Sequence, residues 1–311
     1  MLNRRQFLAG TVGACLPSYA DAMRGPILVP DQPWEGTCAM PFSGGIWNVG
    51  GSWRCYYLAN YTRVCLAFSD DGLTWMKPDL GIIAGTNVLL ELRTMDSFSV
   101  WLHEGLWHMT ISQRSGGPLM LLTSRNGIRW HVVGSMGWAG DRTTFWFNPA
   151  KDRWTFNVRN GAGIGGDPRR IDRVESETFI PKTWTPQPWL RARVEDGADE
   201  AGSVQLYALD VVPMADRLIG LFTLWRGQPL DRPKLNDVCL GFSTDGETWT
   251  RHQQPILTYG SRGQWNFGNV QSVGHGVHYV NGKYRLYASG RSGQPSGNGV
   301  CALGYREVDA L

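Results

Sequence analysis

Short apolar runs alternate with Gly-, Asn- and Asp-containing turns through residues 23–311, and none of them has the period of an amphipathic helix. Two strand-like runs stand in each of five successive units. They cover 45–49 and 53–58, 98–102 and 106–111, 143–147 and 153–158, 204–212 and 217–224, and 270–280 and 283–288. The last pair is separated by Asn281-Gly282, a hairpin signal. The pattern predicts an all-β protein.

A repeated turn motif gives the units their organisation. The pattern Ser-x-Asp/Asn-Gly-x-x-Trp occurs at 69–75, 124–130 and 243–249, with a degenerate copy at 176–179. The Asp-Gly or Asn-Gly pair suits a tight turn with positive φ, and the serine can cap its amides. The last unit lacks this turn, so we expect residues 27–34 to supply its outer strand. The sequence therefore predicts one domain over 23–311, a five-bladed β-propeller of four-stranded antiparallel blades.

Residues 1–22 have the features of an export signal. Arg4-Arg5 lies in a twin-arginine pattern, a weakly apolar stretch follows, and Ala20-Asp21-Ala22 resembles a cleavage site. An alternative is a lipoprotein signal that would leave a lipidated Cys15. The apolar run is shorter than the ~20 residues that a membrane span needs. We expect twin-arginine export to the bacterial periplasm or cell surface.

The composition limits the classes of ligand that the protein is expected to bind. The 30 Lys+Arg and 27 Asp+Glu give a net charge of only +3 without a basic block, which argues against nucleic acid. The 39 Gly and 15 Trp suit many tight turns and stacking on sugars. The six cysteines show no metal-ligand spacing, and a Cys38–Cys301 disulfide stays open. We expect no cofactor and no catalytic metal, with a structural channel ion as an alternative, and a monomer.

The chemistry is expected where the inner strands begin, because these ends line one mouth of a propeller channel. Asp96 and Asp141 directly precede the first strands of the second and third units. Two carboxylates around one pocket suit glycosidic cleavage, one as base or nucleophile and one as a charge partner; capping of the loop is the alternative. Within 196–200, Glu200 is the predicted general acid, and Asp199 is the next candidate.

Other side chains near the expected channel mouth are candidates for holding a substrate. Arginines can bind carboxylates or hydroxyls, aromatic rings can stack on sugars, and amides can bond hydroxyls. The predicted substrate-binding residues are Glu35, Arg142, Trp146, Arg159, Tyr207, Asn269 and Gln271.

Several short motifs in order resemble a known superfamily. They include Pro33-Trp34-Glu35, Asp96-Ser97, and the stretches 42–47, 140–149 and 265–271. The chain resembles the five-bladed propellers of glycoside hydrolase families 32, 43 and 68, and is closest to bacterial family-32-like glycosyl hydrolases. The resemblance implies a glycoside hydrolase of plant or microbial glycans with a carbohydrate substrate. The first inner strand carries no acid, and the Asn-Asp-Pro and Glu-Cys motifs of family 32 are absent. The missing acid makes a non-catalytic carbohydrate-binding propeller the first alternative. A transglycosylase, which would exclude water from the acceptor site, is the second.

Overall fold

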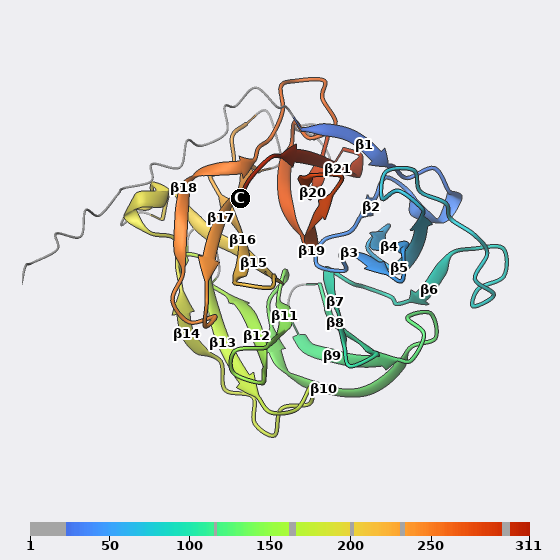
Figure 1. Cartoon of the computed structure of the whole chain (residues 1–311), viewed down its shortest axis with the longest axis horizontal. Helices are drawn as coiled ribbons and strands as arrows, with labels where there is room; N and C mark the ends of the chain where they lie inside the picture. Colours follow the sequence, from blue (N-terminus) through green and yellow to red (C-terminus); the bar gives the residue numbers. More distant parts are fainter. Residues whose placement is uncertain (1–22, 115–116, 162–165, 200–201, 231–233, 294–298) are drawn as a thin grey trace, which may run out of the picture.

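Antiparallel strands pair in chain order into five sheets, which stand side by side in a ring (Figure 1). This computed structural model describes residues 23–114, 117–161, 166–199, 202–230, 234–293 and 299–311. Among them, the only helices are two 3-10 turns, η1 (Pro33–Glu35) and η2 (Val194–Asp196). No helix in these ranges is long and apolar enough to cross a membrane. The predicted all-β, five-bladed propeller is confirmed.

Each blade is one meander of the chain. The first blade contains β2 (Ala39–Met40), β3 (Ile46–Val49), β4 (Ser52–Ala59), β5 (Arg63–Ser69) and β6 (Val88–Glu91). The second contains β7 (Ser97–His103), β8 (Leu106–Ser112), β9 (Gly117–Ser124) and β10 (His131–Ala139). The third contains β11 (Thr144–Asn148), β12 (Arg153–Asn160), β13 (Arg170–Ser176) and β14 (Gln187–Leu190). The fourth contains β15 (Gln205–Pro213), β16 (Leu218–Trp225), β17 (Asn236–Ser243) and β18 (Thr250–Leu257). The fifth contains β19 (Asn269–Val280), β20 (Lys283–Arg291) and β21 (Cys301–Val308).

The two ends of the domain meet in the fifth blade. Its outer strand is β1 (Arg24–Leu28), which pairs with β21. The predicted closure by the N-terminal stretch is confirmed, although the strand lies earlier than 27–34 because Pro33–Glu35 forms η1. Beside this junction the Cys301 N–H donates to the Thr37 carbonyl at 2.9 Å, and the Cys38 and Cys301 thiols are free. The disulfide is thus unformed here, and the Cys38 thiol donates to the Leu58 carbonyl at 3.5 Å.

The repeated turn joins one blade to the next. In each full copy the serine hydroxyl accepts the glycine N–H at 2.8–2.9 Å, and the glycine has a positive φ of 73–75°. The turn carbonyls accept bonds from the preceding blade: Tyr287 donates to Gly72 at 2.9 Å, and Tyr56 donates to Gly127 at 3.0 Å. A Cβ at either glycine would lie 2.3–2.4 Å from that tyrosine hydroxyl. Glycine is therefore required both for the turn and for close contact between blades.

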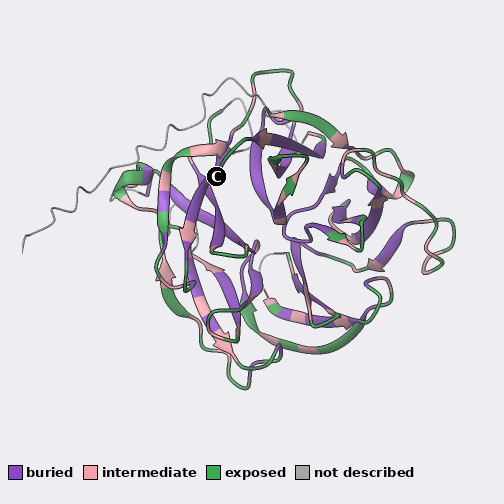
Figure 2. Ribbon diagram, in the orientation of Figure 1, coloured by how far each residue is buried: buried purple, intermediate pink, exposed green. Residues whose placement is uncertain are grey.

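Apolar side chains fill the spaces between blades, so buried residues follow the inner and middle strands while the outer strands and turns are exposed (Figure 2). The ring axis is different, because a buried cation occupies it. Arg142, only 2% exposed, lies just before β11 of the third blade with a φ of 59°.

Arg142 bonds to each of the other four blades. Its N–H donates to the Ser97 hydroxyl of the second blade at 2.9 Å. Its guanidinium donates to Ser43 of the first at 3.2 Å and to the Ser272 carbonyl of the fifth at 3.2 Å. It also pairs with Asp210 of the fourth blade at 3.3 Å, and Asp210 is 3% exposed. One side chain therefore ties the whole ring together.

Asp210→Asn should destabilise the ring strongly. The change keeps the shape of the side chain but leaves the Arg142 guanidinium buried without a counter-charge, which costs about 3–5 kcal/mol of unfolding free energy. Urea unfolding followed by tryptophan fluorescence measures this loss. Glu177→Gln is the matched control, because Glu177 belongs to an ion pair whose side chains are 43% and 75% exposed, and should cost under about 1 kcal/mol. Equal stability of the two variants would show that the axial pair does not hold the ring.

Candidate functional site

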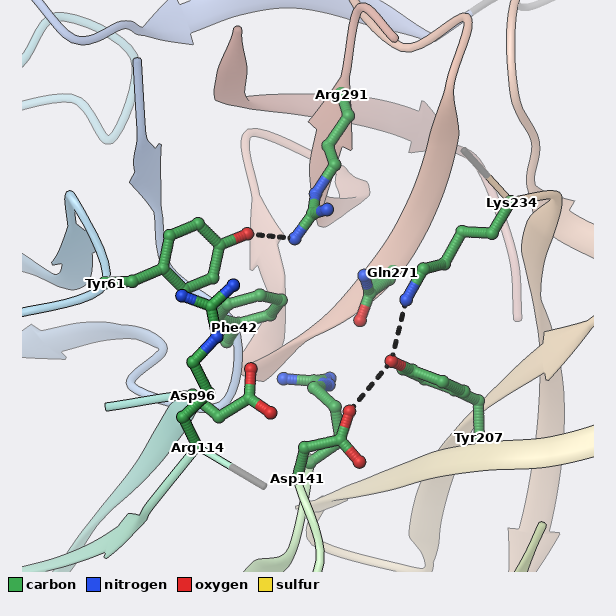
Figure 3. Close-up of a pocket in the computed structure, with 10 residues that line it drawn as sticks. Phe42, Tyr61, Asp96, Arg114, Asp141, Tyr207, Lys234, Gln271 and Arg291 are labelled. Atoms are coloured by element: carbon green, nitrogen blue, oxygen red, sulfur yellow. Dashed lines mark hydrogen bonds between the residues drawn. The ribbon is translucent and has the colours of Figure 1, made fainter. Parts of the chain in front are cut away.

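A cavity of about 250 Å³ lies on the ring axis next to Arg142, and all five blades contribute to its wall (Figure 3). Its lining consists of Phe42, Tyr61, Asp96, Arg114, Asp141, Arg142, Tyr207, Lys234, Gln271 and Arg291. Charged and hydrogen-bonding groups dominate this set. A polar, concave site reached from every blade is the candidate functional site.

The lining residues come from two kinds of position. Asp96, Asp141 and Arg142 precede inner strands, and Tyr207 and Gln271 lie near the start of β15 and β19. The second kind lies at the end of a blade's second strand or in the loop that follows it: Tyr61, Arg114, Lys234 and Arg291. Because neighbouring strands are antiparallel, both kinds reach the same mouth of the channel. Sequence reasoning considered only the first kind. Polar side chains recur after the second strand of each blade, and this recurrence was the signal that could have identified the second kind of position.

The Asp141 carboxylate is held by its neighbours on both oxygens. Oδ2 accepts a bond from the Tyr207 hydroxyl at 3.0 Å, and Oδ1 forms an ion pair with Arg159. Arg159 also donates from Nε to the Asp141 carbonyl at 3.0 Å. Beyond Tyr207, the Lys234 ammonium donates to the tyrosine hydroxyl at 2.9 Å. Four side chains from two blades thus form one chain of polar contacts, which runs from Lys234, Tyr207 and Asp141 in the cavity wall to Arg159 behind it (Figure 3 shows the first three).

This chain changes the acidity of Tyr207. Burial opposes ionisation of the phenol, but the nearby Lys234 and Arg159 charges outweigh it and lower the pKa of Tyr207 to about 8. The hydroxyl is therefore protonated at neutral pH, yet it gives up its proton more readily than an ordinary tyrosine. Such a group suits proton transfer near neutral pH.

The Asp96 carboxylate, by contrast, is free. Its backbone N–H donates to the Ser112 carbonyl at 3.0 Å, which fixes the start of β7. Its side chain is half-buried and points into the cavity (Figure 3). Among the residues that the structure describes, it has no hydrogen-bond or ion-pair partner. Asp96 does not cap the loop, so its two oxygens are available to a ligand.

Four further residues predicted to bind substrate lie in or next to this site, in different roles. Gln271 lines the cavity, and its Nε2 donates to the Asn269 Oδ1 at 3.5 Å. Asn269 is fully buried and not part of the lining. Arg159 lies behind Asp141 rather than in the wall. Arg142 forms part of the wall, but its bonds to the other four blades make it a structural residue.

Two predicted substrate-binding residues lie elsewhere, and the structure corrects both. Glu35 is fully buried; its carboxylate accepts from the Tyr57 hydroxyl at 2.5 Å and pairs with Lys77 at 2.8 Å, so it organises the first blade. Trp146 is 1% exposed and packs against the Gly246 turn of the next blade. Its ring is therefore part of the inter-blade core and cannot stack on a sugar.

The acidic stretch 196–200 is not part of the described cavity wall. Asp196 is buried and pairs with Arg251 at 2.7 Å. The Asp199 carboxylate accepts the Ser203 N–H at 3.0 Å. Glu200, the predicted general acid, lies outside the described residues. Over the part of the chain that the structure describes, no three His, Cys, Asp or Glu side chains could together hold a metal ion.

Comparison with known proteins shows the fold. No family model matches the chain, and no curated protein matches it in sequence. Similar solved structures include the β-1,2-mannobiose phosphorylase from Listeria innocua, at 12% identity and a TM-score of 0.67, covering 93% of this chain and 96% of that one. An N-acetylgalactosamine deacetylase from F. plautii is 14% identical, with a TM-score of 0.61 and coverage of 92% and 95%. A glycosyl hydrolase from Bacteroides ovatus is 15% identical, with a TM-score of 0.57 and coverage of 93% and 95%.

These likenesses concern the fold alone, because the identities are so low. They confirm that the chain shares the five-bladed propeller of proteins that act on carbohydrates. They do not single out families 32, 43 and 68, so that part of the resemblance stays a prediction.

Lys234→Met should raise the pKa of Tyr207 from about 8 to at least its ordinary value of 10, because burial then opposes ionisation with one cation fewer. A near-ultraviolet absorbance titration, taken as the difference from Tyr207→Phe, measures this pKa. At pH 8 about half of Tyr207 should be ionised in the wild type and almost none in the variant. Lys182→Met, at an exposed lysine, is the control and should leave the titration unchanged. An unchanged curve for Lys234→Met would contradict the proposed contact.

Proposed function

We propose that this chain is an exported enzyme that hydrolyses glycosidic bonds in plant or microbial glycans, with its chemistry in the axial cavity. The unpaired Asp96 carboxylate, facing the Asp141–Tyr207–Lys234 chain across one cavity, carries this proposal. Glycoside cleavage needs a carboxylate that is free to take up a proton or attack, together with a proton donor for the leaving oxygen. The fold, which is shared with enzymes of carbohydrate chemistry, supports the assignment.

Asp96 is assigned as the base or nucleophile on the anomeric side. Asp141 is held as an anion by Arg159 and acts as the charge partner that stabilises the positive charge developing on the sugar ring. Tyr207 is the described proton donor: its proton passes to the leaving glycosidic oxygen, and Lys234 stabilises the phenolate that remains. In hydrolysis the proton of the attacking water goes to Asp96 and returns to Tyr207 through solvent. Glu200 stays the alternative donor.

Asp96→Asn should lower kcat by about 10²-fold or more, because the amide can neither accept the proton nor attack. The measurement is a kinetic screen of the mature protein on pyranosides and furanosides, with circular dichroism as a check of the fold. Asp216→Asn, at a carboxylate that is 77% exposed and is not among the residues lining the cavity, is the matched control and should keep full activity. Full activity of Asp96→Asn would remove Asp96 from the mechanism.

The same screen separates the alternatives. A wild type that binds glycans without turnover would favour a carbohydrate-binding propeller, and products longer than the substrate would show transglycosylation. Tyr207→Phe and Glu200→Gln then identify the proton donor. Loss of the true donor spares substrates with activated leaving groups, which need little protonation, and cripples natural glycosides.

Export is the second part of the proposal, and it concerns residues 1–22, which lie outside the described residues. Replacing Arg4-Arg5 by Lys-Lys should leave the precursor in the cytoplasm, because the twin-arginine pair is the recognised signal. Cell fractionation and immunoblotting measure this. Cys15→Ala is the companion variant: release from the membrane by that change would favour the lipoprotein signal. Normal export of the Lys-Lys variant would contradict the twin-arginine assignment.

A further inference from the structure

The cavity holds more positive charge than its carboxylates balance. Among the described residues four cations line it, and two of the six charged groups are neutralised from outside the wall: Arg142 by Asp210, and Asp141 by Arg159. The remaining groups are three cations, Arg114, Lys234 and Arg291, against the single carboxylate of Asp96. None of these three cations forms an ion pair with a carboxylate of the described residues. Counted over the described residues, the wall therefore presents an excess of two positive charges to a ligand.

Arg291 shows most clearly that a partner is missing. It lies at the end of β20, is only 7% exposed, and donates to the Tyr61 hydroxyl. Its Nε has no hydrogen-bond partner among the described groups. Burial lowers the pKa of Arg291, but the nearby Tyr61 hydroxyl and the Cys301 and Cys38 thiols outweigh this effect and raise it. No described carboxylate pairs with the guanidinium, and a bidentate carboxylate is the partner that fits its planar donors best. Arg114 lies on the same side, with its guanidinium 5.8 Å from the centre of the Tyr61 ring.

The cavity contains hydrogen-bond acceptors in addition to its cationic donors. The Gln271 side chain is 1% exposed, and its Oε1 has no described partner and points into the cavity (Figure 3). The Asp96 carboxylate is a second free acceptor. Both require a ligand that donates hydrogen bonds, as sugar hydroxyls do. An inorganic phosphate or sulfate ion has few or no donors, so it would leave these acceptors unmatched and repel Asp96.

We propose that the cavity selects a hexuronic acid residue, a pyranose that carries a carboxylate together with hydroxyl groups. The carboxylate would lie among Arg291, Arg114 and Lys234, and the ring hydroxyls would donate to Gln271 and Asp96. This deepens the proposed function and rests on it, because it names the class of sugar that the same site takes. A uronic acid residue provides one negative charge, which offsets half of this excess, and hydroxyl donors that satisfy the free acceptors.

The test compares matched ligands by isothermal titration calorimetry on the mature protein. The probes are the methyl glycosides of glucuronic and galacturonic acid, their neutral glucose and galactose counterparts, and inorganic phosphate. At least one uronide should bind about tenfold more tightly than its neutral counterpart, and this advantage should shrink at high salt. Arg114→Gln should weaken uronide binding about fivefold or more and leave neutral sugars unchanged, because Arg114 makes no hydrogen bond to the described protein.

Arg125→Gln, at an exposed turn arginine, is the control and should bind like the wild type. Neutral sugars that bind as tightly as uronides would overturn the selection for acid while leaving the proposed glycan site intact. Phosphate that binds when no uronide does would also overturn it. Binding of no sugar, acidic or neutral, would overturn the proposed function itself as well as this inference.

Discussion

The ring depends on one buried ion pair. The guanidinium of Arg142 occupies the axis, pairs with Asp210 and bonds to serines of three other blades, so all five blades have a polar partner in common. A propeller places the starts of its inner strands close together, and their polar groups must be satisfied away from bulk water. A single cation with many fixed donors meets this need. It also closes one side of the cavity, so the element that holds the ring together is a wall of the candidate site.

Charged residues gather at the cavity because the two inner strands of each blade form a hairpin, which returns the chain to the channel mouth where the first strand began. Every inner strand leaves the channel mouth, and the following antiparallel strand comes back to it. A blade can therefore contribute one group before its first strand and another after its second. Asp96 and Arg114 are such a pair in the second blade, and Asp141 and Arg159 are the corresponding pair in the third. In the third blade the two groups neutralise each other, whereas in the second they do not form an ion pair.

This difference between the second and third blades gives the two sides of the site different roles. Asp141 is held by Arg159 and Tyr207, and Lys234 and Arg159 lower the pKa of Tyr207, so this side of the cavity is preorganised. Asp96, Arg114 and Arg291 keep hydrogen-bonding capacity that the folded protein does not use. Groups left unsatisfied in a cavity lower the stability of the free protein and raise its affinity for a complementary ligand.

The sequence by itself determined the fold, because the fold depends on signals between residues that are close together along the chain. The Ser-x-Asp/Asn-Gly turns, the paired apolar runs and the missing last turn predicted five blades, their order and closure by the N-terminal segment. These features depend on φ preferences and on alternation of side chains, which neighbouring residues decide. The sequence also placed Asp96, Asp141, Tyr207 and Gln271 at the channel mouth, since the start of a strand can be recognised locally.

Only the tertiary structure decided what each of these side chains does. Glu35 and Trp146 occupy positions that looked equivalent to site residues, yet packing between blades buried them. Arg142 was predicted to bind substrate, but it instead bonds to residues of the other four blades. Arg114, Lys234 and Arg291 were missed because their nearness to Asp96 arises from strands far apart in the chain. Which charged groups pair depends on distances across the ring. The packing of the blades sets these distances, and no local sequence pattern encodes them.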